Sequence, residues 1–179
     1  MKPRGPLMIE HRLIEKVLAI VRKEAEAISG RKMLDPVFVD TVVDFIRTYA
    51  DRTHHGKEED ILFKALAAKK LAPAHDAMMR KLVDDHVWAR GTVGELVKAK
   101  SSFVAGDTGA SAIVAAKLIA LADFYPRHIR LEDEEFFPAT EAYLTPVELD
   151  AMLKAFWEFD RAMIHEKYRK LYEMLAKHG

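Results

Sequence analysis

The chain has no cysteine among its 179 residues. Disulfide bonds, iron–sulfur clusters and thiolate metal sites are therefore excluded, and a metal ion would have to be bound by nitrogen and oxygen donors. The absence of cysteine also suits a reducing compartment.

Net charge is absent as well, because 28 basic residues balance 28 acidic ones. A neutral chain has no electrostatic attraction for nucleic acid or for an anionic membrane surface. No stretch approaches the roughly 18 uninterrupted apolar residues of a membrane span, and the N-terminus lacks the apolar run of a signal peptide. We therefore expect a soluble, cytoplasmic protein that binds neither nucleic acid nor membrane.

Two common kinds of catalytic motif are missing too. The sequence contains no glycine-rich phosphate-binding loop, and no arrangement of Ser, His and Asp indicates a nucleophilic hydrolase. No β-hairpin signal is convincing either. The chemistry therefore has to be sought among helical segments.

Helical periodicity dominates what is present, since apolar residues recur at three- and four-residue intervals. The pattern predicts an all-α fold: an up-down-up-down four-helix bundle with an additional C-terminal helix. We expect a single domain, 1–179, in which the bundle occupies about 7–140. The predicted helices lie at about 7–28, 36–69, 73–104, 108–139 and 146–177.

Local signals mark several of these boundaries. Asp35-Pro36 reads as an N-cap followed by proline in the first helical turn, and Thr145-Pro146 with Glu148 reads as a capping box. Pro126 falls inside the fourth predicted helix, where it must remove one backbone hydrogen bond.

An internal repeat locates the candidate chemistry. When the chain is shifted by 74 residues, "HHGKEEDILFKA" falls on "HIRLEDEEFFPA", so that His54 meets His128 and Glu58 meets Glu132. With one residue of slip, the acid-histidine pair ending at His11 meets the pair ending at His86. Each half therefore reads as an acid-His pair followed, about 42 residues later, by His-x-x-x-Glu.

Helix geometry brings these residues to one interior. Residues i and i+4 share a helix face, so each His-x-x-x-Glu pair presents an imidazole and a carboxylate in the same direction. His11 shares the apolar stripe of its helix, and Val93 and Val97 support an inward direction for His86. Four helices would then place four histidines and two glutamates in the core.

The energetics of burial favour a metal site over an empty polar core. A buried unpaired charge costs several kcal/mol or shifts its pKa until it is neutral, and a bound cation offsets that cost. Nitrogen and oxygen donors without sulfur suit iron, manganese or zinc. Two carboxylates that can bridge favour two ions over one.

Some neighbouring residues have alternative interpretations. His55 lies about 100° around an α-helix from His54, so we expect it on the surface or behind a ligand, unless Gly56 loosens the helix and the pair His55/Glu59 replaces His54/Glu58. Glu59 and Asp133 either orient ligands or are solvated. Tyr49 and Tyr125 lie near the expected ligands and either pack in the core or donate a hydrogen bond.

As a set, four segments resemble the hemerythrin-like, or HHE cation-binding, domain family: "IEHRLIE", "HHGKEEDILF", "DDHVWARG" and "HIRLEDEEFFPA". The resemblance covers about residues 8 to 140. It implies a four-helix bundle that holds a non-haem centre of two iron ions. The ligands it implies are His11, His54, Glu58, His86, His128 and Glu132, with the two glutamates as bridges.

The sequence also departs from the oxygen-carrying members of that family. Arg90 stands where the carriers have a fifth histidine, and their last carboxylate corresponds to Asp133 rather than Glu132. Arg90 could instead hydrogen-bond a bound anion or a bridging carboxylate. Reversible oxygen carriage is therefore not what the sequence favours.

The function that the resemblance implies is a di-iron protein that binds or senses dioxygen, nitric oxide or peroxide. Two alternatives remain open. One is a di-iron enzyme, either peroxidase-like or one that donates iron to repair damaged iron centres. The other is an iron- or oxygen-responsive regulatory module, in which the C-terminal helix contacts a partner or forms a homodimer.

Overall fold

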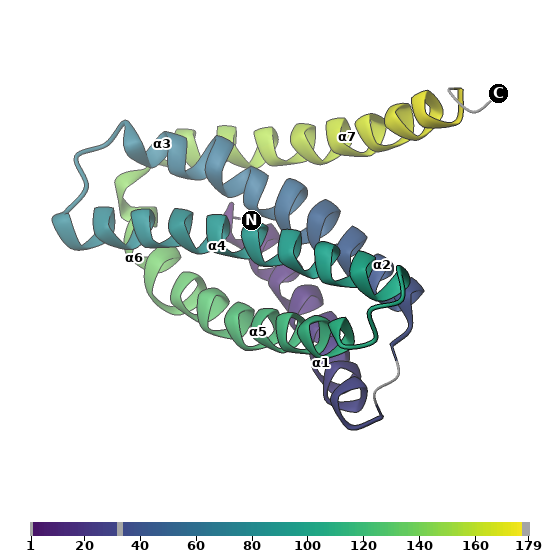
Figure 1. Cartoon of the computed structure of the whole chain (residues 1–179). Coiled ribbons are helices and arrows are strands. Elements are labelled where there is room, and N and C mark those ends of the chain that lie inside the picture. The colour runs from purple at the N-terminus through teal and green to yellow at the C-terminus, as the bar shows by residue number, and fades with distance from the viewer. Residues whose placement is uncertain (1, 32–33, 177–179) are drawn as a thin grey trace.

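Helices make up almost all of the chain in the computed structural model (Figure 1). The structure describes residues 2–31 and 34–176, with residues 31 and 164–176 described as backbone only. The described residues contain no strand. The prediction of an all-α bundle with an additional C-terminal helix is therefore confirmed.

The bundle consists of four long helical segments, three of them close to the predicted bounds. They are α1 (Arg4–Arg31); α2 (Pro36–Phe45) with η1 (Ile46–His55), η2 (Glu58–Phe63) and α3 (Lys64–Ala67); α4 (Pro73–Val104); and α5 (Ala110–Arg130) with η3 (Leu131–Phe136) and α6 (Phe137–Thr140). The 3₁₀ turn η4 (Glu141–Tyr143) leads into α7 (Pro146–Ala176). The last residue of the predicted helix 146–177 lies outside the described residues.

The helix starts follow the predicted capping chemistry. The Asp35 carboxylate accepts a hydrogen bond from the Val37 amide at 2.9 Å. At the start of α7, the Thr145 amide donates to Glu148 Oε2 at 2.8 Å, and the Glu148 amide donates to Thr145 Oγ1 at 3.3 Å. These reciprocal bonds form a capping box, which satisfies amides that a helix start leaves without partners. Pro126 lies inside α5, which continues to Arg130.

The second and fourth helical segments are not uniformly α-helical, which the sequence did not predict. The segments η1, η2 and η3 have π-helical hydrogen bonding, from residue i to i+5. A π-turn holds more residues than an α-turn, so side chains that diverge on an α-helix can face the same way. His54, His55, Glu58 and Glu132 all lie in these segments.

A polar layer separates two hydrophobic clusters inside the bundle. The larger cluster draws on residues 14–28, 39–50, 93–99 and 114–129, and the smaller one on residues 7, 62–66, 82, 136–144, 152 and 156. Along α1 the order is Leu7, His11, Ile14, and along the second segment it is reversed, from Ala50 through the polar layer to Leu62. The segments therefore alternate in direction, as predicted.

The additional helix α7 lies along the second segment, against η1 and η2 (Figure 1). Met152 and Phe156 of α7 complete the smaller hydrophobic cluster. Near Gly56, Phe159 packs so closely that a Cβ atom at position 56 would lie 2.7 Å from its ring. Within the described part of the chain, no helix combines the length and apolarity needed to cross a membrane.

Candidate metal centre

Seven ionisable side chains meet in the polar layer, where each is at most 3 % exposed. Six of them are the residues proposed from the repeat, and the seventh is His55. They come from all four segments of the bundle: His11, His54, His55, Glu58, His86, His128 and Glu132. The structure therefore brings all the predicted site residues together.

Four of the histidines form two pairs through their Nε2 atoms. In the first half of the chain, His11 Nε2 lies 2.8 Å from His54 Nε2. In the second half, His86 Nε2 lies 3.2 Å from His128 Nε2. Each pair thus turns two nitrogen donors toward a common point.

The two glutamates lie between these pairs. Glu58 places Oε1 3.5 Å from His54 Nε2 and Oε2 3.5 Å from His86 Nε2, so its oxygens reach one histidine of each pair. Glu132 Oε2 lies 3.2 Å from His11 Nε2 and 3.3 Å from His128 Nε2. Both carboxylates therefore occupy the position from which a carboxylate can bridge two ions.

A second layer of carboxylates orients these histidines. Each Nδ1 faces an acid, which fixes the ring and leaves Nε2 turned inward, an arrangement common around protein metal ions. The pairs are His11 with Asp133 at 2.8 Å, His54 with Glu10 at 2.8 Å, His86 with Glu59 at 2.6 Å, and His128 with Asp85 at 3.5 Å. Glu59 and Asp133 thus orient candidate ligands, one of the two roles considered from the sequence.

The acids follow the symmetry of the repeat. Glu10 and Asp85, each directly before the first histidine of its half, contact the second histidine of the same half. Glu59 and Asp133 contact the first histidine of the opposite half. A signal for Glu10 and Asp85 existed in the sequence, since an acid precedes the first histidine in both halves.

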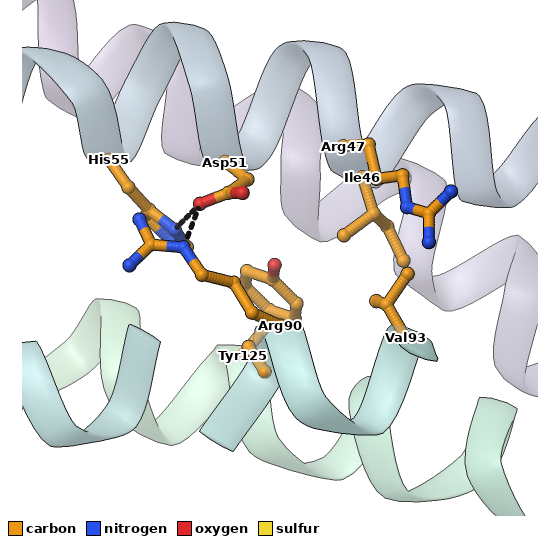
Figure 2. A pocket seen from close by; sticks show the side chains of 8 residues that line it. Ile46, Arg47, Asp51, His55, Arg90, Val93 and Tyr125 are labelled. Atoms are coloured by element: carbon orange, nitrogen blue, oxygen red, sulfur yellow. Dashed lines mark hydrogen bonds and ion pairs between the residues drawn. The ribbon is translucent and has the colours of Figure 1, made fainter. Parts of the chain in front are cut away.

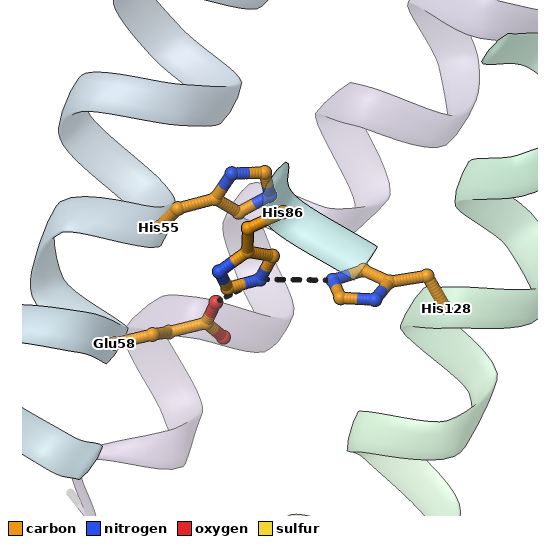
Figure 3. A group of neighbouring side chains, drawn as sticks. All are labelled: His55, Glu58, His86 and His128. Atoms are coloured by element: carbon orange, nitrogen blue, oxygen red, sulfur yellow. Dashed lines mark hydrogen bonds and ion pairs between the residues drawn. The ribbon is translucent and has the colours of Figure 1, made fainter. Parts of the chain in front are cut away.

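His55 is buried, so the surface position considered from the sequence is wrong, and it joins His54 in the core instead of replacing it. It is 1 % exposed, and its ring stacks on His86 with centroids 3.8 Å apart. Figure 3 shows it converging with Glu58, His86 and His128. The reason is the π-helical conformation of η1, which lets adjacent residues of one segment both face the core.

Arg90, at the place of the carriers' fifth histidine, contacts neither bridging glutamate in the described contacts. Its Nε donates to Asp51 at 2.8 Å and its Nη2 donates to Glu59 at 2.8 Å. Asp51 in turn lies 3.3 Å from His55 Nδ1. Arg90 therefore holds the two acids that orient His55 and His86.

Burial and charge shift the pKa values in this layer strongly. Burial and the charge of Glu132 raise the pKa of Glu58 well above its usual range. Burial also raises the pKa of Glu132, but His128 and His11 outweigh it and lower the value to about 2. For His11 burial lowers the pKa, while Asp133 and Glu132 outweigh that effect and raise it to about 9.

The pKa values of the two histidines of η1 shift in the opposite direction from that of His11. Burial, with the neighbouring histidines, lowers the pKa of His54 well below its usual value and that of His55 to about 3. Both imidazoles are therefore neutral at pH 7, which is the state in which an imidazole binds a metal ion.

The arrangement fits two metal ions. Two groups of side chains have one donor atom each within 4.8 Å of the others: His11, His54, Glu58 and Glu132, and His55, Glu58, His86 and His128. The carboxylate oxygens of Glu58 and Glu132 and the Nε2 of His55 are buried and make no hydrogen bond with the described residues. Such atoms are costly to bury without partners, and cations would supply those partners.

Lys57 is the polar residue of the site that sequence reasoning missed. Its side chain is fully buried, and Nζ pairs with Glu10 and with Asp160 of α7, the latter at 2.8 Å. Glu10 also orients His54. A chain of contacts therefore runs from α7 through Lys57 and Glu10 to a candidate ligand.

The chain matches a known protein family. A model of the hemerythrin HHE cation binding domain matches residues 6–140, which contain every side chain of both candidate ligand groups. The match ends before α7 begins. Neither the curated proteins nor the solved structures compared with the chain gave a match.

Proposed function

The chain belongs to the hemerythrin HHE cation-binding domain family, and from this membership we propose that it is a non-haem di-iron protein that binds or senses dioxygen, nitric oxide or peroxide. The observation that carries the proposal is the pair of buried donor groups that share Glu58. Five histidines and two carboxylates without sulfur suit iron, although manganese and zinc accept the same donors.

In the proposed centre, His11 and His54 would hold one ion and His55, His86 and His128 the other. Glu58, which both donor groups contain, would contribute to both ions, and Glu132 chiefly to the ion held by His11 and His54. Bound iron would supply the redox chemistry and the affinity for diatomic ligands that these side chains lack. The surrounding apolar clusters exclude water, and Arg90 keeps the supporting acids in place.

The direct test is the metal content of protein purified without added metal, together with its visible spectrum. We expect about two iron ions per chain, as two donor groups require, and charge-transfer bands when dioxygen is added to the reduced protein. A colourless protein that contains stoichiometric zinc would contradict the proposal.

A second candidate function, a metal-responsive regulatory module, is favoured by the contact chain through Lys57. Metal binding at His54 would act on Glu10 and Lys57 and thereby on the attachment of α7 through Asp160. The position of α7 would then control the binding of a partner or of a second copy of the chain.

This alternative can be tested by limited proteolysis of α7 in metal-free and metal-loaded protein. Metal should protect α7 in the wild type, and Lys57→Met should abolish the difference. Lys69→Met is the matched control, since Lys69 pairs with Glu148 of α7 but makes no described contact with the centre. Equal cleavage of both metal states in the wild type would rule the module out.

A further inference from the structure

A cavity of about 240 Å³ lies beside the candidate metal centre, between the second segment, α4 and α5 (Figure 2). Its lining includes His55, Arg90 and Tyr125. One water molecule needs only about 10–15 Å³ of such space, so the cavity is much larger than dioxygen or hydrogen peroxide requires. It is smaller than the roughly 300–1,000 Å³ of sites for drug-sized ligands.

Two residues that line the cavity each have a buried polar atom without a hydrogen-bond partner among the described residues: the hydroxyl of Tyr125 and Nε2 of His55. Tyr125 is 1 % exposed, and its phenolic hydroxyl is a hydrogen-bond donor. If His55 binds metal, the Tyr125 hydroxyl remains as a donor without an acceptor. A buried donor without an acceptor is costly, and a bound molecule would remove that cost.

The unpaired charge at the cavity is positive. The Asp51 carboxylate is engaged by Arg90 and His55, and Arg90 is engaged by Asp51 and Glu59. Arg47, by contrast, is exposed and has no ion-pair partner among the side chains that the structure describes. The remaining wall is apolar, formed by Ile46, Ala89 and Val93.

We propose that this cavity binds a short-chain carboxylate, whose charged group accepts a hydrogen bond from Tyr125 and is attracted by Arg47, and whose hydrocarbon part packs on the apolar wall. A donor, a positive charge and an apolar surface are the features that such a molecule needs. The site goes beyond the proposed function, because a diatomic ligand would use neither the volume nor Arg47. Neither Tyr125 nor Arg47 belongs to a candidate ligand group, so binding is expected in metal-free protein as well.

The experiment is calorimetric titration of the full chain, metal-free and metal-loaded, with sodium butyrate and with 1-butanol. Butyrate should bind at least about tenfold more tightly than 1-butanol, as expected for a charge-assisted hydrogen bond. Tyr125→Phe should weaken butyrate binding roughly tenfold or more, and Arg47→Gln should weaken it and reduce its salt dependence. Tyr49→Phe, which removes a hydroxyl away from the cavity lining, should change nothing.

The outcomes separate this proposal from the proposed function. Equal affinity for butyrate and 1-butanol, no effect of Tyr125→Phe, or no binding to the wild type would each overturn the carboxylate site. If the protein holds no iron but still binds butyrate through Tyr125, the proposed function fails and the carboxylate site stands. Because Tyr125→Phe removes a buried hydroxyl without a partner, its melting temperature should not fall, which shows that the variant is folded.

Discussion

The two halves of the bundle have the same ligand frame, but the first half adds a histidine where the second has a hydrocarbon side chain. At a shift of 74 residues, His54 and Glu58 correspond to His128 and Glu132, whereas His55 corresponds to the buried Ile129. Likewise Asp51, which supports His55, corresponds to Tyr125. The two donor groups are therefore unequal: one contains three histidines and the other two.

This inequality suggests different roles for the two proposed ions. The group with three histidines lies next to the cavity that Arg90 and Tyr125 line, while the group with two histidines and both carboxylates is tied to α7 through Glu10 and Lys57. A symmetric repeat thus becomes a centre with one side toward a ligand cavity and the other toward the additional helix. Five predictions test that difference.

The largest effect is expected at Glu58, since both donor groups contain it. Glu58→Gln should lower the affinity for both ions by at least about 100-fold, whereas Glu132→Gln should affect chiefly the ion held by His11 and His54. The stabilisation by a bound ion, about 4 kcal/mol at a metal concentration of 1,000 times Kd, should therefore fall by about 2.7 kcal/mol or more in Glu58→Gln. Metal analysis and thermal unfolding with and without metal measure both effects. Equal losses in the two variants would mean that Glu58 has no special position.

Replacing His55 by isoleucine, the residue at the corresponding position 129, should give the two halves the same set of donor side chains. His55→Ile removes one nitrogen from the group of three histidines while keeping the site filled, so we expect one tightly bound ion per chain in place of two. The control is His75→Gln, because His75 contacts Tyr143 away from the centre. Elemental analysis after gel filtration measures the number of ions per chain. Two retained ions in His55→Ile would show that His55 is not a ligand.

Metal affinity should depend on pH in a direction set by His11 and Glu58. Both pKa values are raised, that of His11 to about 9, so His11 carries a proton at pH 7 that a metal ion must displace, and Glu58 keeps its proton to higher pH than an ordinary carboxyl group. Affinity should therefore rise with pH up to about 9, roughly tenfold per pH unit for each displaced proton. Titration with a chelating competitor at several pH values measures the slope, and a flat profile would contradict protonation at these groups.

The acids that orient the histidines should contribute unequally to metal affinity in the two halves. Glu10 lies 2.8 Å from His54, whereas Asp85 lies 3.5 Å from its counterpart His128. Loss of such a support typically lowers metal affinity 10- to 100-fold, and we expect Glu10→Gln near the upper limit and Asp85→Asn near the lower one. Competition titrations of the two variants give the comparison directly, and a larger loss in Asp85→Asn would reverse it.

The smallest effect is expected at Gly56, which Phe159 of α7 covers, while its counterpart Arg130 is exposed. Gly56→Ala forces the Phe159 ring to shift, at a cost of about 1 kcal/mol, which lowers the melting temperature by about 2–4 °C in a protein of this size. Arg130→Ala should stay within about 0.5 kcal/mol of the wild type. Calorimetry distinguishes the two, and metal content should be unchanged in both.

The sequence predicted the helices and the six residues of the repeat because both follow from local rules. Apolar periodicity marks helices, and His-x-x-x-Glu places two donors on one helix face. The caps at Asp35 and Thr145 are short-range signals of the same kind. Spacing along each helix therefore predicted correctly that these six side chains face the core.

His55 and Lys57 were beyond such reasoning, for two physical reasons. The interpretation of His55 assumed α-helical geometry throughout. The local sequence does not predict the π-helical turns that bring this side chain into the core. Lys57 is buried because Asp160 and Phe156 of α7 approach it, about 100 residues later in the chain. Contacts at that separation depend on tertiary packing, which periodicity does not reveal.

The position of the polar layer between two hydrophobic clusters also affects local unfolding of the native protein. Each cluster is a candidate unit of cooperative unfolding, and the layer between them is the part of the core with the weakest cohesion when its carboxylates lack partners. Cations bound there would link side chains from all four segments. Loading the centre would thereby couple the two clusters, so that the ions proposed for the chemistry would also limit the native-state motions of the bundle.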